Sequence, residues 1–430
     1  MNNRGKALPA PKLRFPEFRG ARGWTASQLI DLTDVGLSNG VFNDPKKVGT
    51  GYKLINVGDM YIDTTIVDER LSLLTLSVSD FEANQVKHGD IFFTRSSLVK
   101  SGIAVSNIYL GNSSDVTFDG HLIRFRANSS KVAPLFAHYL FKTTPVREQL
   151  VARGKSGTMT TIGQSDVGGV MLSYPEMNEQ RRVADCLSAL DELIAAQARK
   201  VDALKTHKKG LMQQLFPREG ESQLLVRFLE FREAGEWVSS SLGAVFGTTS
   251  GGTPVRSEAD YWDGDIPWIT TSLVSYGVIT EAEEYISQAG LKNSSAKLLP
   301  KGTVLIAMYG QGKTRGKVAL LGVEATTNQA CAAVLPKKGI NPYFVFSNLA
   351  GRYDEFRKLS NSGGQENLSQ TLIRDFPFSY PMDEKEQQSI ADCLTSLETL
   401  ITATIQELDT LKTHKQGLMQ QLFPSAEVDA

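Results

Sequence analysis

One short stretch of the sequence could bind a nucleotide phosphate. The residues AMYGQGKT, from Ala307 to Thr314, approximate a phosphate-binding loop, with Ala307 where the stricter pattern has glycine. Such a loop needs a helix directly after it, so that the amides of the helix N-terminus point at the phosphates. The residues that follow, RGKVALLGVEATTN, are β-branched and interrupted by glycine, which does not favour a helix. ATP binding through Lys313 is therefore an alternative interpretation.

The same stretch also fits an exposed basic turn that contacts DNA phosphates and base edges. The matching place in the N-terminal half, RSSLVKSG from Arg95 to Gly102, is basic and rich in hydroxyl groups as well. Two basic loops at equivalent positions outweigh one partial motif, and the hydroxyl groups of Thr270 to Ser272 could line a groove beside the second. The DNA-binding candidates are Arg95, Ser96, Ser97, Lys100, Thr270, Thr271, Ser272, Tyr309, Gln311, Lys313, Thr314, Arg315 and Lys317.

No residue pattern predicts catalysis by this chain. The tetrapeptide from Asn341 to Phe344 (NPYF) is like the NPP(Y/F) motif of adenine methyltransferases, but its second proline is absent. The five histidines form no triad, and the three cysteines form neither a disulfide framework nor a metal-binding spacing. We therefore predict no catalytic residue, no metal site and no cofactor in the chain itself.

The bulk composition is that of a soluble globular protein. The 430 residues carry 46 basic and 47 acidic side chains, for a net charge of −1, so the charge neither indicates nor excludes a nucleic-acid partner. The N-terminus lacks the apolar core of a secretory signal, and no apolar run is as long as a membrane span. The expected location is the cytoplasm, with no membrane partner.

The candidate loops must be positioned by larger elements, and the clearest of these is a helix that the sequence contains twice. LKTHKKGLMQQLFP, from Leu204 to Pro217, recurs as LKTHKQGLMQQLFP, from Leu411 to Pro424. In both copies apolar residues alternate at spacings of four and three, which is typical of a coiled coil. A polar residue and then a lysine interrupt both seams at the same places. The predicted helix-pairing positions are Val183, Leu187, Leu190, Ile194, Val201, Leu204, Leu211, Leu215, Ile390, Leu394, Leu397, Ile401, Leu408, Leu411, Leu418 and Leu422.

The regions between the helices are diverged copies of each other too. VKHGDIFFTR, which ends at Arg95, matches LPKGTVLIAM, which ends at Met308, and both blocks end in SYP ahead of a helix. Short β-rich runs and short helical patterns predict an α+β fold for each block. The predicted domains are a globular block at 1–176, a long helix at 177–217, a second block at 218–381, a second long helix at 382–424 and a tail at 425–430.

The chain resembles the specificity subunits of type I restriction–modification systems over essentially its whole length. The resemblance rests on the block–helix–block–helix order, the duplicated GLMQQLFP helix ends and the SYP junctions. It also rests on IPWITTS (266–272), GTVLIAMYG (302–310) and TNQACAAVLP (327–336) in the second block. The first block has no clear IPWI equivalent, and its nearest match is KLINVGDM (53–60).

The resemblance implies two tandem target recognition domains, each of which reads one half of a split, asymmetric DNA sequence. The two long helices would pair as an antiparallel coiled coil, set the unread spacer and give the repeat pseudo-twofold symmetry. The implied partners are double-stranded DNA, methyltransferase subunits (usually two) and a motor–nuclease subunit. S-adenosylmethionine, ATP and Mg²⁺ are expected on those subunits. The chain would direct adenine methylation and restriction without being an enzyme.

Two other classes of protein remain as alternatives. The first is an ATP-binding protein that uses Lys313, which predicts ATP hydrolysis by the purified chain. The second is a coiled-coil scaffold that binds only protein, which predicts no change in DNA affinity when Lys313, Arg315 and Lys317 become alanine. Recognition of DNA predicts weaker binding and a shallower salt dependence after that change, because fewer counterions are released.

Overall fold

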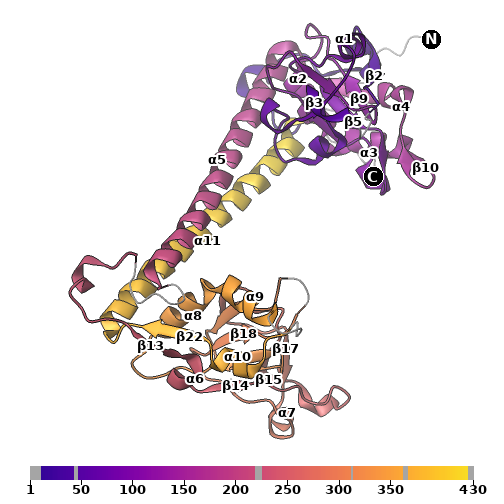
Figure 1. The fold of residues 1–430 in the computed structure, drawn as a ribbon. Helices are drawn as coiled ribbons and strands as arrows, with labels where there is room; N and C mark the ends of the chain where they lie inside the picture. Colours follow the sequence, from indigo (N-terminus) through magenta and orange to yellow (C-terminus); the bar gives the residue numbers. More distant parts are fainter. Residues whose placement is uncertain (1–10, 43–46, 218–224, 311–312, 362–366, 425–430) are drawn as a thin grey trace. The chain divides into compact units, whose positions relative to one another are not determined.

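The computed structural model of the chain describes residues 11–42, 47–217, 225–310, 313–361 and 367–424. Contacts divide the chain into two compact units. The first unit holds residues 1–199 and 406–430, and the second holds residues 200–405. Each unit therefore combines one globular block with a piece of each long helix (Figure 1).

The first globular block mixes short strands with short helices. Its strands are β1 (Thr25–Gln28), β2 (Leu37–Asn39), β3 (Val48–Ile55), β4 (Ser72–Leu74), β5 (Ile91–Thr94), β6 (Ser96–Ser97), β7 (Ser106–Ile108), β8 (Val116–Phe118), β9 (Leu122–Phe125), β10 (Lys155–Ser156), β11 (Thr160–Thr161) and β12 (Met171–Tyr174). Its helices are α1 (Val78–Asn84), α2 (Pro134–Phe141), α3 (Thr144–Arg153) and α4 (Gln164–Gly168).

Two sheets form the centre of this block. The four-stranded sheet has the antiparallel order β2-β9-β5-β7, and in the three-stranded sheet β3 pairs antiparallel with β4 and parallel with β8. Strand β5 is buried along its whole length. Ile91 and Phe93 pack in the core that includes helix α2, whereas Phe92 packs in a second core. The alternation of a strand thus places apolar side chains on both faces of the sheet.

The second block is built in the same way. Its strands are β13 (Val238–Ser241), β14 (Thr248–Ser250), β15 (Trp262–Ile269), β16 (Val278–Ile279), β17 (Glu284–Ile286), β18 (Val304–Ala307), β19 (Val318–Leu321), β20 (Thr326–Thr327), β21 (Cys331–Val334) and β22 (Pro377–Tyr380). Its helices are α6 (Leu242–Val245), α7 (Gln288–Lys292), α8 (Pro342–Ala350), α9 (Tyr353–Asn361) and α10 (Gln370–Arg374).

The two blocks share their strand order. The run β14-β21-β18-β19 corresponds to β2-β9-β5-β7, with β16 added at the edge. Strand β15 pairs antiparallel with β17 and parallel with β20, as β3 pairs with β4 and β8. Because β3 ends at Ile55 and β15 ends at Ile269, the structure confirms that KLINVGDM is the first-block counterpart of IPWITTS.

The two long helices are α5 (Met177–Leu215) and α11 (Glu384–Leu422), and they contact each other within both units (Figure 1). Every predicted pairing position is buried or half-buried. The polar residues that interrupt the seams, Gln197 and Thr404, are buried as well. The predicted α+β fold with two long paired helices is thereby confirmed.

The helix segments are antiparallel within each unit. In the first unit Leu422 packs in one core with Val183, and farther along α5 Lys415 pairs with Asp191. Later residues of α5 therefore contact earlier residues of α11, as they do in an antiparallel pair. The second unit repeats this order at the other ends of the helices.

The lysine that interrupts each seam pairs with a carboxylate of the other helix. Lys415 pairs with Asp191 in the first unit, and Lys208 pairs with Glu398 in the second. The four residues occupy matching places in the two helical repeats. Polar pairs in an apolar seam favour one register over its neighbours.

The end of each helix completes the core of a block. Phe423 at the end of α11 packs against Trp24 in the first block, with ring centroids 6.1 Å apart. Phe216 at the end of α5 packs against Trp237 in the second block, with centroids 6.4 Å apart. Each block is thus closed by the helix that follows the other block in the sequence.

No helix among the described residues has both the length and the apolar character needed to cross a membrane. Within the same residues, no group of three or more His, Cys, Asp or Glu side chains is arranged to hold a metal ion.

Candidate nucleic-acid interface

The predicted basic loop of the first block directly follows the buried strand β5. Arg95 and Lys100 are exposed, and Ser96 and Ser97 form the half-buried strand β6. Strand β6 pairs with β11, and β11 pairs with β10. The loop and the hairpin of residues 155–161 consequently form one surface. This hairpin was not predicted from the sequence, although its Lys-Ser-Gly-Thr start has the composition of an exposed turn.

One arginine holds the backbone of this loop. The guanidinium group of Arg147, on helix α3, donates hydrogen bonds to the carbonyl oxygens of Ser101 (3.1 Å), Ile103 (2.7 Å) and Ala104. The hydroxyl group of Thr94 donates to the carbonyl of Gly102 at 3.3 Å. These bonds fix the loop relative to the sheet and leave its outer side chains free.

The predicted basic loop of the second block follows β18 at the equivalent place. Tyr309 and Lys313 are exposed, whereas Gln311 lies outside the described residues. Arg315 is only 7% exposed, and its Nε atom has no hydrogen-bond partner among the described residues. The expectation that Arg315 is exposed is therefore wrong, whereas its assignment as a DNA contact stays a prediction. Arg315 lies in a tight turn against the end of β18, because the amide of Gly316 donates to the carbonyl of Ala307 (2.9 Å) and the amide of Lys317 donates to the carbonyl of Thr314 (3.1 Å).

The remaining side chains of this loop lie beside two tyrosines. Thr314 and Lys317 are half-buried, and the Nζ atom of Lys317 lies 5.9 Å from the centre of the Tyr276 ring. The hydroxyl group of Tyr353 donates to the carbonyl of Lys313 at 3.0 Å. Burial raises the pKa of Tyr276, as do the nearby Tyr353 and an aspartate, so its ring remains neutral beside the lysine.

Two backbone hydrogen bonds bring the hydroxyl candidates to the same end of the block. The amide of Asn328 donates to the carbonyl of Ile269 (3.1 Å), which immediately precedes Thr270. The amide of Met308 donates to the carbonyl of Ala330 (2.8 Å). The loops after β15, β18 and β20 therefore converge.

Within this convergence the hydroxyl groups are available to a ligand. Thr270 and Thr271 are half-buried and Ser272 is exposed, and the hydroxyl oxygens of Thr270 and Ser272 are 2.5 Å apart. Gln329 also lies here and was not among the predicted residues; its side-chain oxygen accepts a hydrogen bond from the hydroxyl group of Thr253 at 2.6 Å. Gln329 is the last residue of the TNQ sequence (327–329), which entered the prediction only as part of a family motif.

The partial phosphate-binding motif lacks the helix that it would need. The chain after Lys317 forms strand β19, so the element that directly follows this loop is a strand and not a helix. The NPYF stretch has a structural role instead, because the Asn341 side chain accepts hydrogen bonds from the amides of Tyr343 and Phe344 and caps helix α8. Neither motif supports the ATP-binding alternative.

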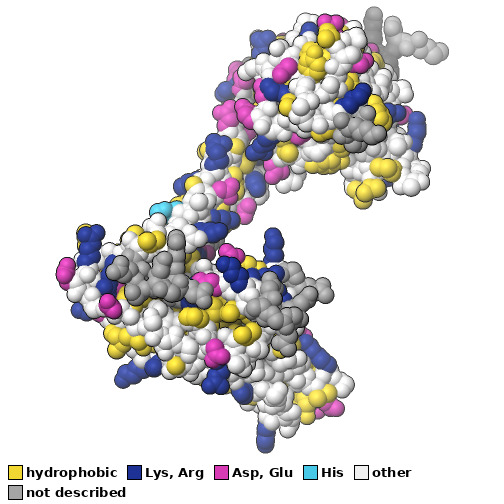
Figure 2. Space-filling model, viewed as in Figure 1, with side chains coloured by type: hydrophobic (Ala, Val, Ile, Leu, Met, Phe, Trp, Pro, Cys, Tyr) yellow, Lys and Arg dark blue, Asp and Glu magenta, His cyan; other side chains and the backbone are white. Residues whose placement is uncertain are grey.

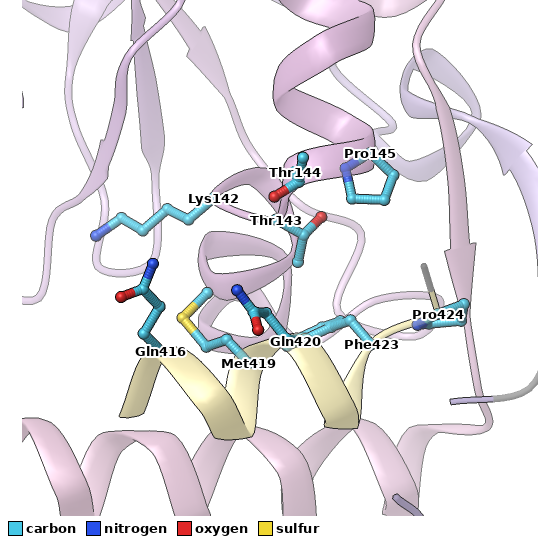
Figure 3. A pocket seen from close by; sticks show the side chains of 9 residues that line it. All are labelled: Lys142, Thr143, Thr144, Pro145, Gln416, Met419, Gln420, Phe423 and Pro424. Atoms are coloured by element: carbon cyan, nitrogen blue, oxygen red, sulfur yellow. The ribbon is translucent and has the colours of Figure 1, made fainter. Parts of the chain in front are cut away.

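Among the described residues, pockets also lie at the two helix ends. In the first unit a pocket of about 200 Å³ separates Lys142 and Thr143, at the end of α2, from Gln416, Met419 and Gln420 on α11 (Figure 3). A pocket of about 250 Å³ occupies the matching place in the second unit. Its helical wall contains Met212, Gln213 and Phe216, which the repeat aligns with Met419, Gln420 and Phe423. The repeat thus conserves one wall of each pocket.

Trp262 and Trp268 of the second block pack against other residues of that block. Trp268 is buried, as core packing predicts, and its ring nitrogen donates to the carbonyl of Gly252 at 2.9 Å. Trp262 is half-buried under the guanidinium group of Arg256, which lies 3.9 Å from the ring centre. The hydrogen bond from Arg256 lowers the pKa of Glu284, its ion-pair partner.

Known proteins that are similar to this chain fit its organisation into two globular blocks and two long helices. Residues 234–413 match the family model for the type I restriction modification DNA specificity domain. The chain is 28% identical over 187 residues to the type I restriction enzyme EcoR124I/EcoR124II specificity subunit of Escherichia coli, which is 42% of this chain and 46% of that protein. It is 22% identical over 413 residues to the MjaX specificity subunit of Methanocaldococcus jannaschii, a putative type I restriction enzyme, over 93% of this chain and 92% of that protein.

Solved structures share the fold. The S subunit of a type I restriction–modification system from M. genitalium matches with a TM-score of 0.57 and 18% identity, over 97% of this chain and 99% of that chain. A chain from a study of complex assembly and conformational transition of the type I system matches with a TM-score of 0.59 and 17% identity, over 96% and 100%. The chain spans just under half the length of the E. coli relative. Residues 234–413 thus match the DNA specificity domain of type I systems, and most of the chain is similar in sequence to type I specificity subunits.

Proposed function

We propose that this chain is the DNA-recognition subunit of a type I restriction–modification complex and contributes no catalysis of its own. Each globular block reads one half of a bipartite, asymmetric site. The observation that carries the proposal is the placement of the two basic loops, which follow the equivalent strands β5 and β18 in blocks of the same strand order. Because the loops differ in sequence, the two half-sites differ too.

The repeated surface of the long helices supports docking of two copies of one partner, which we take to be the methyltransferase subunit. Burial explains why the apolar seam is repeated, but it does not explain identical exposed side chains. Residues 205–207 and 412–414 both read KTH, and all six are exposed. The exposed glutamine pairs of the two GLMQQLFP ends are also identical. A motor–nuclease subunit completes the proposed complex, which acts in the cytoplasm.

In this proposal the paired helices set the distance between the half-sites. Removing one heptad from each helix at matched positions keeps the apolar seam in phase. The expected result is a recognised site with the same two half-sites and a shorter spacer. Altered half-site sequences would show that the helices do more than separate the blocks.

The decisive experiment maps methyladenine in the host genome with and without the gene. The proposal predicts that methylation at one split motif disappears when the gene is deleted and returns when it is restored. Expression of the chain together with its methyltransferase in a host that lacks the motif supplies the control. If that pair neither methylates nor binds any split motif, the function is not DNA recognition and the scaffold alternative gains weight.

A further inference from the structure

The first block exposes three apolar side chains at the end of its small sheet. Leu98 is 83% exposed, Val99 61% and Met159 40%, and we call these three residues the apolar tip. Ser97 pairs with Thr160 in the β6–β11 ladder. Because Leu98 and Met159 are the next residues outward on the two strands, they lie opposite each other at the end of that ladder.

The apolar tip is held in solvent by its supports. Beyond the hydrogen bonds from Arg147 and Thr94 described above, the amide of Val99 donates to the Ser97 hydroxyl group (3.3 Å) and the amide of Gly102 donates to the carbonyl of Val99 (3.0 Å). Exposed leucines are ordinary on protein surfaces when they are single. Adjacent apolar side chains on a fixed loop are instead a pre-organised contact surface.

Basic side chains surround the tip. Arg95 and Lys100 flank it in the loop, and Lys155 lies on the hairpin with its side chain 73% exposed, although it also pairs with Asp166 at 3.1 Å. In Figure 2 hydrophobic side chains gather on the edge of the first unit where Figure 1 labels β10, with Lys and Arg nearby. Protein interfaces are depleted in lysine, whereas phosphates attract lysine and arginine. The charge therefore matches DNA.

We propose that Leu98 and Val99 contact base edges of the half-site read by the first block and select a thymine through its methyl group. This inference rests on the proposed function. In the major groove, the thymine methyl is the apolar feature that distinguishes a base pair, and apolar side chains pack against it. Arg95 and Lys100 bind the flanking phosphates, and Arg147 acts as a positioning residue for the loop. The residues that align with Leu98 and Val99 in the second block are Gln311 and Gly312, neither of which is an apolar aliphatic residue.

The test uses the full chain assembled with its methyltransferase on its mapped site. Each thymine of both half-sites is replaced in turn by uracil, which removes only the methyl group. The expected result is a loss of affinity of about three- to fivefold at one position of one half-site, as expected for one buried methyl group. The Leu98→Ala and Val99→Ala variants should bind thymine and uracil equally at that position. Val78→Ala is the matched control, because Val78 is 62% exposed on helix α1 of the same unit.

Three outcomes would overturn the inference. The first is a complex that binds its site but is indifferent to every thymine methyl group. The second is a Leu98→Ala variant that retains the full preference for thymine. The third is a Leu98→Ala variant that no longer assembles with the methyltransferase while the Val78→Ala control does, which would make the tip a protein contact. Failure of the unmodified complex to bind any split site would instead refute the proposed function itself.

Discussion

Arg14 binds Glu179 in the first unit at 2.8 and 2.6 Å, and Arg227 binds Glu386 in the second at 2.8 and 2.7 Å. This ion pair is the same in both units, whereas the eight residues after β5 and after β18 differ. Their sequences, RSSLVKSG and MYGQGKTR, share only one lysine. Contacts within the frame have been retained since duplication, while loops facing solvent have changed. Buried pairs resist change because removing one partner leaves an uncompensated charge. A loop that reads DNA can change freely as long as the frame presents it.

The first prediction concerns replacement by alanine of the phenylalanine that completes the core of each block. Phe423→Ala should destabilise the first unit and Phe216→Ala the second, each by about 3–5 kcal/mol, because a large core side chain is lost. Hydrogen exchange followed separately in the two units measures the effect. If each variant instead loosened the block that precedes its own helix in the sequence, the assignment of helix ends to blocks would be wrong.

The second prediction concerns the one difference between the equivalent tryptophans. The ring nitrogen of Trp237 donates to Glu386 at 3.2 Å, whereas the buried ring nitrogen of Trp24 has no partner among the described residues. Trp237→Phe should therefore cost about 1–3 kcal/mol more than Trp24→Phe, because it leaves a carboxylate with one donor fewer. Urea unfolding of the two variants, with exchange resolved by unit, provides the comparison, and equal losses would contradict it.

The third prediction is a difference in acid sensitivity. His138 is buried in the first unit, and burial with the nearby Lys142 and Lys415 lowers its pKa well below the usual value. The unfolded chain then binds a proton that the folded unit does not. Stability is full above about pH 6.5 and falls as the pH drops below it, by about 1.4 kcal/mol at pH 5.5. The matching residue of the second unit is Phe346.

The variant His138→Phe copies the second unit into the first and removes this proton-linked loss. Exchange rates of the first unit should rise between pH 7.5 and 5.5 in the unmodified chain, after correction for intrinsic exchange, and rise less in the variant. The second unit serves as the internal control. An identical pH dependence of the first unit in both proteins would exclude His138 as the cause.

The smallest effect is expected from the basic loop of the second block. Arg315 is buried, so replacing it would mix a folding defect with a binding defect. Lys313→Ala combined with Lys317→Ala should instead lower DNA affinity about fivefold and make the slope of log K against log salt shallower by roughly 2. Lys301→Ala combined with Lys338→Ala is the control, because both lysines are exposed in the same block outside the loop. An equal change in the slope of that control would deny the loop a special role.

Periodicity explains why the long helices were predictable. Eight apolar positions at regular spacing predict the buried face of each long helix, and the same pattern occurs in both copies of the repeat. The equivalence of strands β5 and β18 was also predictable, because the internal repeat aligns their sequences. Loop conformation has no comparable periodic pattern in the sequence. Arg315 and Lys313 are near neighbours of the same charge, yet only the side chain of Arg315 is buried. Backbone hydrogen bonds of the turn, from Gly316 to Ala307 and from Lys317 to Thr314, hold Arg315 against the end of β18, and the charge of a residue does not reveal such a turn.

The hairpin beside the first basic loop illustrates the same limit. Thr160 and Ser97 pair although 63 positions separate them, and no pattern in either short segment predicts that pairing. The internal repeat could align the two blocks with each other, but it could not show which loops meet within a block. The candidate residues were consequently easier to choose by charge than by position. Apolar residues such as Leu98 were not among the candidates, because an apolar residue type by itself indicates burial and not a contact surface.

The closure of each block by a distant helix end makes the order of synthesis unequal for the two. When the second block emerges from the ribosome, Phe216 has already been made. The first block must wait for Phe423, which at typical rates of translation arrives roughly 10 to 50 seconds after the block itself. During that interval the surfaces of Trp24 and Phe136 that Phe423 will cover remain open. The N-terminal block is therefore the last to mature, and a nascent chain is exposed to misfolding and chaperone binding there for longest.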